Sequence, residues 1–336
     1  MTTRVAINGF GRIGRLVLRA IVESGRKDIQ VVGINDLGPP ETNAHLLRHD
    51  SVHGKFPHEV KVAGDTIDAG LGPMKVTAIK NPAELPWKEL NVDIAFECTG
   101  IFTAKDKASA HLTAGAKRVL VSAPGEGADL TVVYGVNEDK LTKDHIIVSN
   151  ASCTTNCLGP VAWVMHKAVG IEQGFMTTIH SYTGDQPTLD TYHKDLYRAR
   201  AAALNIIPTS TGAAKAIGLV IPELKGKLDG SSMRVPTPNV SLVDFKFTAK
   251  KATSVEEINN AVMEAAKSNR LARILTWTKE PLVSSDLNHD SHSATFCVDQ
   301  TKVIDGKFVR VVAWYDNEWG FSNRMADTAV AMARLM

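Results

Sequence analysis

The sequence predicts an α/β protein of two domains, the first with a parallel sheet and the second an α+β domain with a largely antiparallel or mixed sheet. Three observations support this fold class. The chain has 336 residues, which exceeds the length at which one hydrophobic core usually stops growing. Strand-like and helix-like patterns alternate as far as about residue 150, as the crossovers of a parallel sheet require. Beyond Gly170, longer strand-like runs with few helices follow.

The N-terminal segment combines a strand, a glycine-rich turn and a helix. Residues 4–8 form a short β-like run, and a G-x-G-x-x-G pattern follows at once as Gly9-Phe10-Gly11-Arg12-Ile13-Gly14. Apolar residues then repeat at helical spacing through Leu16, Val17, Ala20 and Ile21. Such glycines permit a tight turn, let the backbone approach a pyrophosphate and pack the helix against the strand. The segment therefore predicts a Rossmann dinucleotide-binding domain.

A carboxylate follows the second predicted strand. Residues 29–34 form another β-like run, which ends at Asn35 and Asp36, and Asp36 follows Gly14 by 22 residues. A separation of about 20 is typical of the carboxylate that accepts hydrogen bonds from an adenosine ribose. Because a carboxylate would repel a 2′-phosphate, we predict NAD rather than NADP as the cofactor. The alternative is a solvated turn aspartate after a structural glycine loop.

Two later strands of the first domain end in small polar residues. Apolar runs at 92–98 and 118–122 flank a helix-like segment at 105–114. In parallel sheets, ligands bind beyond the carboxyl ends of the strands. Thr99 and Ser122 are therefore predicted to contact the dinucleotide.

The sequence predicts neither a metal site nor a disulfide framework. His45, His49 and His53 would share one helix face and could in principle bind a metal, but no carboxylate or cysteine joins them in a recognisable zinc motif. Surface histidines are the simpler interpretation. The four cysteines, at positions 98, 153, 157 and 297, include no C-x-x-C pair.

A cysteine stands at the predicted start of a helix, just after the first domain. The helix-like run 158–169 is preceded by Asn150-Ala151-Ser152-Cys153-Thr154-Thr155-Asn156-Cys157. Backbone N–H groups at a helix N-terminus favour an anion and lower the pKa of a thiol from about 8.5. We therefore predict Cys153 as a nucleophile, with the hydroxyls of Ser152 and Thr154 beside it. The alternative is a buried cysteine that packs as a small hydrophobe.

We place the NAD-binding domain at residues 1–151 and the catalytic domain at 152–317. The strand-like runs of the second domain lie at 176–180, 243–247, 295–298 and 308–314. Residues 304–307 supply a hairpin-turn signal, and Ser254 with Glu257 forms a capping box ahead of a helical pattern. This mixture of strands and a few helices predicts the α+β class.

Two groups of residues could act with Cys153. His180 ends a predicted strand and is followed by a long polar loop. If His180 meets Cys153, it can stabilise a thiolate and exchange a proton with a substrate oxygen, although a packed or exposed histidine fits the sequence equally well. Segments 208–212 and 232–236, with Arg198, offer hydroxyls, a glycine N–H and arginines that suit phosphate. Solvated surface arginines are the alternative.

Composition and charge limit the expected partners. The net charge of +2 gives no reason to expect nucleic acid or an anionic membrane as the main partner. The N-terminus lacks the basic and apolar regions of a signal peptide, and there is no run of 18 apolar residues. We therefore expect a cytoplasmic protein.

Six segments together resemble those of phosphorylating, NAD-dependent glyceraldehyde-3-phosphate dehydrogenases of the bacterial type. They are residues 7–14, 149–156, the segment around His180, 210–215, 234–239 and 314–320. The resemblance spans essentially the whole chain, the segments follow in the expected order, and the cysteine segment is highly specific.

The resemblance implies covalent catalysis. Cys153 would attack the aldehyde of D-glyceraldehyde 3-phosphate to form a hemithioacetal, and His180 would serve as the base while hydride passes to NAD. Inorganic phosphate would then attack the thioester and release 1,3-bisphosphoglycerate, a step of glycolysis and gluconeogenesis. The family also implies a homotetramer in which the loop after His180 packs near a neighbouring subunit's cofactor. A C-terminal helix at 318–336 would return to the first domain.

The resemblance also assigns binding residues. Thr183 and Arg234 would bind the substrate phosphate. The attacking phosphate would be bound by Ser152, Thr154, Thr211 and Gly212, with Arg198 nearby. Besides the glycines Gly9, Gly11 and Gly14 and the residue Thr99, the contacts to NAD would be Arg12, Ile13, Asp36, Lys80, Ser122 and Asn317, the last through the nicotinamide amide. Lys80 and Tyr197 stand where many bacterial relatives carry arginine.

Two other functions share the nucleophile. Erythrose-4-phosphate dehydrogenase has the same fold, cysteine and histidine, but its relatives depart around the positions of Thr183 and Gly212, where this chain keeps the glyceraldehyde-type pattern. A thiol redox sensor or binding protein would need only the thiol of Cys153. The full set of Cys153, His180 and both phosphate-binding groups favours the dehydrogenase.

Overall fold

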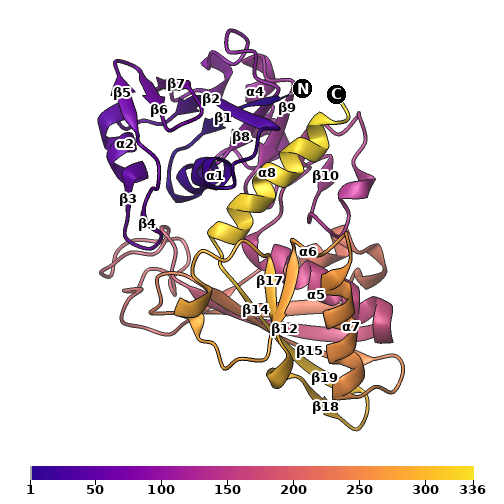
Figure 1. Ribbon diagram of the computed structural model, residues 1–336. Helices are drawn as coiled ribbons and strands as arrows, with labels where there is room; N and C mark the ends of the chain where they lie inside the picture. Colours follow the sequence, from indigo (N-terminus) through magenta and orange to yellow (C-terminus); the bar gives the residue numbers. More distant parts are fainter. Residues whose placement is uncertain (1) are drawn as a thin grey trace. The chain divides into compact units, whose positions relative to one another are not determined.

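The computed structural model describes residues 2–336 and divides them into two compact units (Figure 1). The first unit holds residues 2–132, Glu138–Ala151 and Ser322–Met336. The second holds Val133–Asn137 and Ser152–Phe321. None of the helices among residues 2–336 is both long and apolar enough to cross a membrane.

The first unit is built on a nine-stranded sheet with the order β10-β11-β9-β8-β1-β2-β7-β6-β5. The seven strands from β10 to β7 pair in parallel, while β5, β6 and β7 pair antiparallel. This is the parallel sheet that the sequence predicted. The strands are β1 (Thr3–Asn8), β2 (Ile29–Asn35), β5 (Lys61–Ala63), β6 (Thr66–Asp68), β7 (Pro73–Thr77), β8 (Ile94–Glu97), β9 (Arg118–Val121), β10 (Leu130–Thr131) and β11 (Ile147–Ser149).

Helices lie in the connections of the first unit and at its C-terminal end. They are α1 (Arg12–Glu23), α2 (Pro40–Arg48), α3 (Lys105–Ala108), α4 (Ala110–Thr113) and the part of α8 (Trp319–Ala333) from Ser322 onward, with the short helices η1 (Pro82–Glu84) and η2 (Glu138–Lys140). A small hairpin, β3 (His49–Asp50) with β4 (Gly54–Lys55), follows α2. The single helix predicted over 105–114 is divided at Ser109, which ends α3 and begins α4.

The C-terminal helix is fixed to the first unit by polar contacts. Arg118 on β9 donates to the carbonyl oxygens of Met332 and Leu335, at 2.8 and 2.9 Å. Thr328 donates to Asn150 Oδ1 at 2.8 Å. Both Arg118 and Thr328 are buried, so these bonds attach α8 firmly to the sheet.

The second unit contains an eight-stranded mixed sheet, as predicted. Its order is β13-β14-β12-β15-β19-β17-β16, with β18 paired to β19. The pairs β12/β14 and β16/β17 are parallel, and the others are antiparallel. The strands are β12 (Ile171–Ser181), β13 (Ile207–Ser210), β14 (Leu228–Val235), β15 (Ser241–Ala249), β16 (Leu275–Thr278), β17 (Ala294–Cys297), β18 (Lys302–Ile304) and β19 (Phe308–Tyr315).

Three helices cover one face of this sheet (Figure 1). The helices α5 (Cys153–Val169), α6 (Ala213–Val220) and α7 (Val255–Lys267) contact strands β19, β14 and β16, respectively. Short helices η3 (Pro222–Leu224), η4 (Ser284–Leu287) and η5 (Val298–Gln300) lie in the connections. The hydroxyl of Ser254 accepts a hydrogen bond from Glu257 N at the start of α7, which confirms half of the predicted capping box. The Glu257 carboxylate accepts from Thr253 instead.

Candidate active site

Cys153 is the first residue of α5, the helix that follows β11, the last strand of the first sheet along the chain. Ser152 caps this helix, because its hydroxyl accepts a hydrogen bond from Thr155 N at 3.1 Å. Ala151, directly before the cap, has φ +58°, a left-handed conformation that is uncommon for a residue with a side chain. The predicted helix start is therefore correct. A strained turn at Ala151 places the thiol at the N-terminus of α5.

His180, near the end of β12, lies in contact with Cys153, at the start of α5. Its Nε2 lies 3.5 Å from the Cys153 sulfur, and its Nδ1 lies 2.7 Å from the carbonyl oxygen of Ser181. A carbonyl only accepts hydrogen bonds, so Nδ1 carries the ring proton of the neutral imidazole. The Nε2 lone pair is then directed to the S–H group, which is the geometry of a base and its nucleophile.

The buried setting keeps both groups uncharged when each is considered alone. Burial lowers the pKa of His180 to about 3, and the charge of Arg234 acts in the same direction. Burial raises the pKa of the Cys153 thiol and outweighs the opposing effects of Arg234 and Thr154. Our expectation of a lowered thiol pKa is therefore wrong for the isolated thiolate, because desolvation costs more than the helix N-terminus offsets. The thiol proton of Cys153 can therefore move to His180 Nε2, but neither group ionises independently of the other.

Arg234 supplies the positive charge beside this pair. One of its terminal nitrogens, Nη1, donates to Thr183 Oγ1 at 2.7 Å, to Gln186 Oε1 at 3.2 Å and to the carbonyl oxygen of Ser181 at 3.2 Å. Its Nε is buried without a hydrogen-bond partner among residues 2–336. A half-buried guanidinium with an unpaired, buried Nε–H suits an anionic ligand. Thr183 and Arg234, which the resemblance assigns to the substrate phosphate, are thus direct neighbours.

Arg198 lies at the rim of the same region. Its Nε donates to Thr209 Oγ1 at 3.1 Å, and Nη1 pairs with Asp185 at 2.9 Å. Thr183 also donates to Asp185, so this carboxylate joins the two predicted phosphate-binding groups. Thr209 belongs to the segment 208–212 that was predicted to suit phosphate, whereas Asp185 and Gln186, in the long loop after His180, were not predicted.

A second helix N-terminus lies beside the first. Gly212 caps α6, and Thr211 Oγ1 accepts a hydrogen bond from Ala213 N at 3.2 Å. The hydroxyl of Thr155 lies 3.5 Å from the Ala213 carbonyl oxygen, which joins the first turns of α5 and α6. An added Cβ on Gly212 would meet no atom within 4 Å, so space is open at this cap. Two converging N-termini with open space suit an anion.

Thr154 also joins a buried hydroxyl network. Its hydroxyl lies 2.8 Å from the hydroxyl of Tyr315, which also lies 2.8 Å from Thr178 Oγ1. The Tyr315 ring meets His180 edge-on, with centroids 5.9 Å apart. Tyr315 and Thr178 were not predicted, and a buried tyrosine hydroxyl that needs partners was the only available signal.

The glycine turn of the first unit fits a dinucleotide. A Cβ on Gly14 would lie 2.0 Å from the Gly9 carbonyl oxygen, and one on Gly9, whose φ is +90°, would lie 2.7 Å from Thr99 N. A Cβ on Gly11 would meet nothing within 4 Å. The fold itself therefore requires two of the glycines, while the third leaves open space beside the backbone, as the binding of a pyrophosphate would need.

Asp36 and Arg12 lie beside this turn. Asp36 Oδ2 accepts from Phe10 N at 2.8 Å, so the carboxylate that follows β2 is held against the glycine loop. Arg12, the first residue of α1, forms a two-pronged pair with Asp50 at 3.2 Å. Burial alone would raise the pKa of Asp50, but the N–H groups of His53 and Val52 together with Arg12 lower it to about 2. Asp50 was not predicted.

Thr99, Ser122 and Lys80 follow three of the parallel strands of the first sheet. They lie just beyond the ends of β8, β9 and β7, respectively. Lys80 is exposed. Ile79, its neighbour, accepts a hydrogen bond from Asn35 at the end of β2. The predicted cofactor residues of the first unit therefore gather at the carboxyl edge of one sheet.

A buried polar network supports this edge. Glu97 Oε2 accepts from Asn8 Nδ2 at 2.7 Å and from His111 Nε2 at 2.8 Å, while Oε1 accepts from Thr99 N at 2.8 Å. Trp87 Nε1 donates to His111 Nδ1 at 3.0 Å, so the imidazole is neutral and its Nε2 donates to Glu97. Glu97 was not predicted, although a glutamate that ends an apolar strand run was a visible signal.

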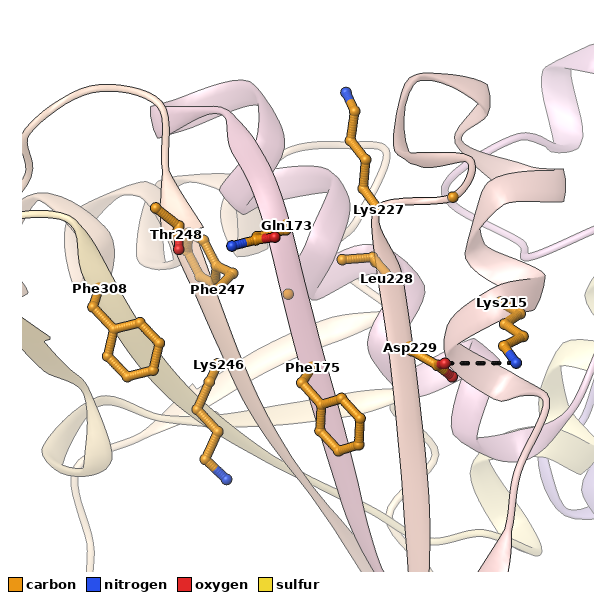
Figure 2. Close-up of a pocket in the computed structure, with 12 residues that line it drawn as sticks. Gln173, Phe175, Lys215, Lys227, Leu228, Asp229, Lys246, Phe247, Thr248 and Phe308 are labelled. Atoms are coloured by element: carbon orange, nitrogen blue, oxygen red, sulfur yellow. Dashed lines mark ion pairs between the residues drawn. The ribbon is translucent and has the colours of Figure 1, made fainter.

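No group of three or more histidine, cysteine or acidic side chains within residues 2–336 could hold a metal ion. His45 and His49 lie with their ring centroids 5.0 Å apart on α2. A hollow of about 660 Å³ lies on the second unit, over the first residues of β12 and β14 and the last residues of β15, and Cys153 does not line it. Figure 2 shows Phe175, Lys246 and Phe308 around it, with the Lys215–Asp229 ion pair at its edge.

Together, a dinucleotide-type glycine turn and a close cysteine–histidine pair are typical of an NAD-binding oxidoreductase. Comparison with known families assigns residues 3–105 to the NAD-binding domain of glyceraldehyde 3-phosphate dehydrogenase. Residues 152–317 match the C-terminal domain of the same family. The chain belongs to the glyceraldehyde-3-phosphate dehydrogenase family, and its cofactor is NAD.

Curated relatives match this chain from end to end. It is 74% identical to the glyceraldehyde-3-phosphate dehydrogenase of Xanthobacter flavus and 72% identical to that of Cereibacter sphaeroides, with all of both chains covered in each case. It is 54% identical to the glyceraldehyde-3-phosphate dehydrogenase of Geobacillus stearothermophilus, with 99% of both chains covered. These matches confirm the resemblance and the dehydrogenase class predicted from the sequence.

Proposed function

We propose that this chain catalyses the oxidative phosphorylation of D-glyceraldehyde 3-phosphate to 1,3-bisphosphoglycerate, with NAD and inorganic phosphate, in glycolysis and gluconeogenesis. The observation that carries this proposal is the Cys153–His180 pair at 3.5 Å, beside an arginine with an unspent buried donor, in a chain of this family. A thiol sensor would need neither the base nor the two groups suited to phosphate.

The first half of the reaction forms a covalent adduct on Cys153. As the sulfur attacks the aldehyde carbon, His180 Nε2 takes the thiol proton and delivers it to the aldehyde oxygen, which gives a hemithioacetal. Nε2 next accepts the hemithioacetal hydroxyl proton, so electron density moves into a new C=O bond as the C–H bond breaks. NAD, when bound, supplies the acceptor for the departing hydride. The product on Cys153 is a thioester.

The second half releases the acyl group to phosphate. An oxygen of inorganic phosphate attacks the thioester carbonyl, the C–S bond breaks, and the leaving thiolate recovers a proton from the His180 imidazolium. The proton of the attacking phosphate passes to solvent. Because the thioester retains the free energy of oxidation, the acyl phosphate forms without a separate energy source.

Two phosphate positions follow from the donor groups. Thr183 and Arg234 bind the phosphate of the substrate, since their side chains are already joined at 2.7 Å. The attacking phosphate is bound at the paired helix N-termini by Ser152, Thr154, Thr211 and Gly212. Arg198 assists at the rim.

The first unit binds NAD through the carboxyl edge of its sheet. We assign this role to the glycine turn and the residues around it, namely Gly9, Gly11, Arg12, Ile13, Gly14, Asp36, Lys80, Thr99 and Ser122. Asn317 contacts the nicotinamide amide. The functional domains are then 1–151 with the helix at 318–336, and 152–317.

The active form is a homotetramer in the cytoplasm. On the sheet face that α5, α6 and α7 leave uncovered, Phe175 is 48% exposed and Phe308 is 45% exposed. The loop after His180 exposes Tyr192 at 90% and Leu196 at 82%. Apolar surfaces of this kind support burial against further copies of the chain.

The test is NADH formation from glyceraldehyde 3-phosphate and NAD, with and without inorganic phosphate. Turnover that requires phosphate and disappears in Cys153→Ser supports the proposal. A parallel assay with erythrose 4-phosphate measures selectivity. No turnover of glyceraldehyde 3-phosphate by folded, NAD-bound protein contradicts the proposal, and turnover of erythrose 4-phosphate alone would assign the chain to that substrate instead.

A further inference from the structure

One buried serine connects the residue that holds the catalytic histidine to Asn317. Ser241 is the first residue of β15 and is 1% exposed. Its hydroxyl accepts a hydrogen bond from Ser181 N at 3.1 Å and lies 2.8 Å from Asn317 Oδ1. The carbonyl oxygen of the same Ser181 accepts from His180 Nδ1 and from Arg234. Ser241 therefore has one hydrogen bond to Ser181, which orients His180, and one to Asn317.

The direction of these bonds fixes the Asn317 amide. A backbone N–H only donates, so Ser241 uses a lone pair toward Ser181 and retains its own proton for Asn317. Asn317 therefore presents its oxygen to Ser241. A flipped amide would leave the Ser241 proton without an acceptor in a buried place, which costs free energy.

The opposite end of the same amide carries the NH₂ group. Asn317 is only 4% exposed, and the hydrogen bond from Ser241 uses its Oδ1 and leaves its Nδ2 for another partner. An NH₂ group suits a carbonyl oxygen of a ligand. The carboxamide of nicotinamide offers such an oxygen.

The backbone around Ser241 is held under strain. Val240, directly before it, has φ +66°, which is an outlier for a β-branched residue. The Val240 carbonyl oxygen accepts from Ser181 Oγ at 2.9 Å, and Asn239 donates to Asp316 at 2.9 Å. Strain of this kind persists where the surroundings over-determine the conformation. Here it aligns the start of β15 with both Ser181 and the segment before α8.

We propose that Ser241 is a positioning residue for the cofactor. Its hydroxyl turns Asn317 Nδ2 toward the nicotinamide carboxamide oxygen and fixes that amide relative to Ser181, which orients His180. The inference rests on the proposed function, because it requires NAD and the assigned role of Asn317. A fixed amide holds the nicotinamide in one orientation, so hydride is delivered to one face of the ring.

The first experiment is a double-mutant cycle on NAD binding, measured by calorimetry with the full-length protein. Ser241→Ala raises the Kd for NAD about tenfold, the effect of one buried hydrogen bond. Asn317→Ala raises it at least as much, and adding Ser241→Ala to that variant has little further effect, since Ser241 acts through Asn317. The matched control is Ser293→Ala, which removes a buried hydroxyl that has no partner among residues 2–336 and leaves the Kd unchanged.

The second experiment reads the orientation directly. Aldehyde deuterated at the reacting carbon is oxidised, and the NADH is analysed by NMR for the ring face that received deuterium. Ser241→Ala places a measurable fraction on the second face, whereas wild type and Ser293→Ala use one face. Asn317→Asp, which keeps an oxygen for Ser241 but loses the NH₂ group, weakens NAD binding and provides the test if Ser241→Ala does not fold.

The outcomes separate this inference from the function beneath it. A wild-type protein that does not bind NAD overturns the function and the inference together. Wild-type NAD binding with an unchanged Kd and unchanged face selectivity in Ser241→Ala overturns the inference alone. Additive effects of Ser241→Ala and Asn317→Ala also overturn it, because Ser241 would then act independently of the amide.

Discussion

The reactivity of Cys153 depends on where its proton goes. A thiolate alone is disfavoured by burial, which raises its pKa, and an imidazolium alone is disfavoured by burial and by Arg234. Proton transfer from sulfur to Nε2 creates both charges at 3.5 Å, where each offsets the other. The hydrogen bond from Nδ1 to Ser181 keeps Nε2 directed at the sulfur. The histidine therefore determines when the nucleophile forms.

Replacing this histidine should expose the unfavourable pKa of the thiol. In His180→Asn, alkylation of Cys153 by iodoacetamide at pH 7 should slow by about 10- to 100-fold, because the thiol must then ionise alone. Its rate should keep rising through pH 9, since burial raises the thiol pKa above that ordinary value. The wild-type rate should vary less over this range. Mass spectrometry of the modified peptide measures both rates, and equal rates at pH 7 would contradict the assigned role of His180.

The glycines of the turn separate folding from cofactor binding. Gly14→Ala should weaken both stability and NAD binding, because its Cβ would lie 2.0 Å from the Gly9 carbonyl oxygen and the turn would have to open. We expect the free energy of unfolding to fall by about 1–3 kcal/mol. Gly11→Ala should retain stability, since its φ is −67° and its Cβ meets nothing within 4 Å. It should still lose NAD affinity, because the methyl group occupies the space for the pyrophosphate. Thermal unfolding and calorimetry measure the two effects. Normal NAD affinity in Gly11→Ala would exclude this placement of the cofactor.

The sequence predicted the reactive residues better than it predicted the residues that hold them in place. The residues Cys153, His180 and Asp36 carry local signals, namely a helix start, a strand end and a fixed distance from a glycine turn. Ser241 carries none, because its importance arises from the antiparallel pairing of β12 with β15, which brings residues 60 positions apart into contact. Gln186 and Tyr315 are similar cases. Their roles depend on three-dimensional neighbours that no local pattern specifies.

At the scale of elements, two helices begin with the same cap but in different settings. Ser152 caps α5 and Ser254 caps α7, each accepting a backbone N–H at 3.1 Å. Ser254 is exposed at the surface, whereas Ser152 is joined to Thr155 and precedes the nucleophile. The two caps should therefore contribute similarly to stability and differently to catalysis.

This difference can be measured with two alanine variants. Ser152→Ala and Ser254→Ala should each lower the free energy of unfolding by about 1 kcal/mol, the typical value of an N-cap. Ser152→Ala should also slow phosphate-dependent turnover and raise KM for phosphate, because the proposed anion site loses a hydroxyl. Ser254→Ala should keep wild-type turnover. Urea unfolding with steady-state assays tests both statements, and equal KM values for phosphate in all three proteins would remove Ser152 from the phosphate site.

The least predictable element was β14. Its sequence, Leu228–Val235, contains glycine and two serines and has no regular alternation of apolar residues, so no strand signal was available. It joins the sheet because α6 returns the chain parallel to β12. The same pairing brings Arg234 level with His180. The position of the arginine in the site therefore follows from a long-range pairing that local propensity did not predict.

At the scale of the whole molecule, the second sheet has two unequal faces. Helices α5, α6 and α7 pack on one of them, and alternate residues of β12, β15 and β19 on the other stay partly exposed. Antiparallel sheets commonly leave one face to water, but such faces are usually polar. Here Phe175 and Phe308 stand beside the hollow shown in Figure 2. This surface is more apolar than a solvated face requires.

Charge on this face should therefore break the proposed assembly. Phe175→Glu would place a carboxylate in the buried contact, where an unpaired charge costs several kcal/mol. Light scattering after size-exclusion chromatography should show four copies in the wild type and two or fewer in the variant. The control is Val255→Glu on α7, which is 38% exposed on the helix-covered side and should leave the tetramer intact. A tetrameric Phe175→Glu would place the interface elsewhere, and the exposed loop with Tyr192 and Leu196 would be the next surface to test.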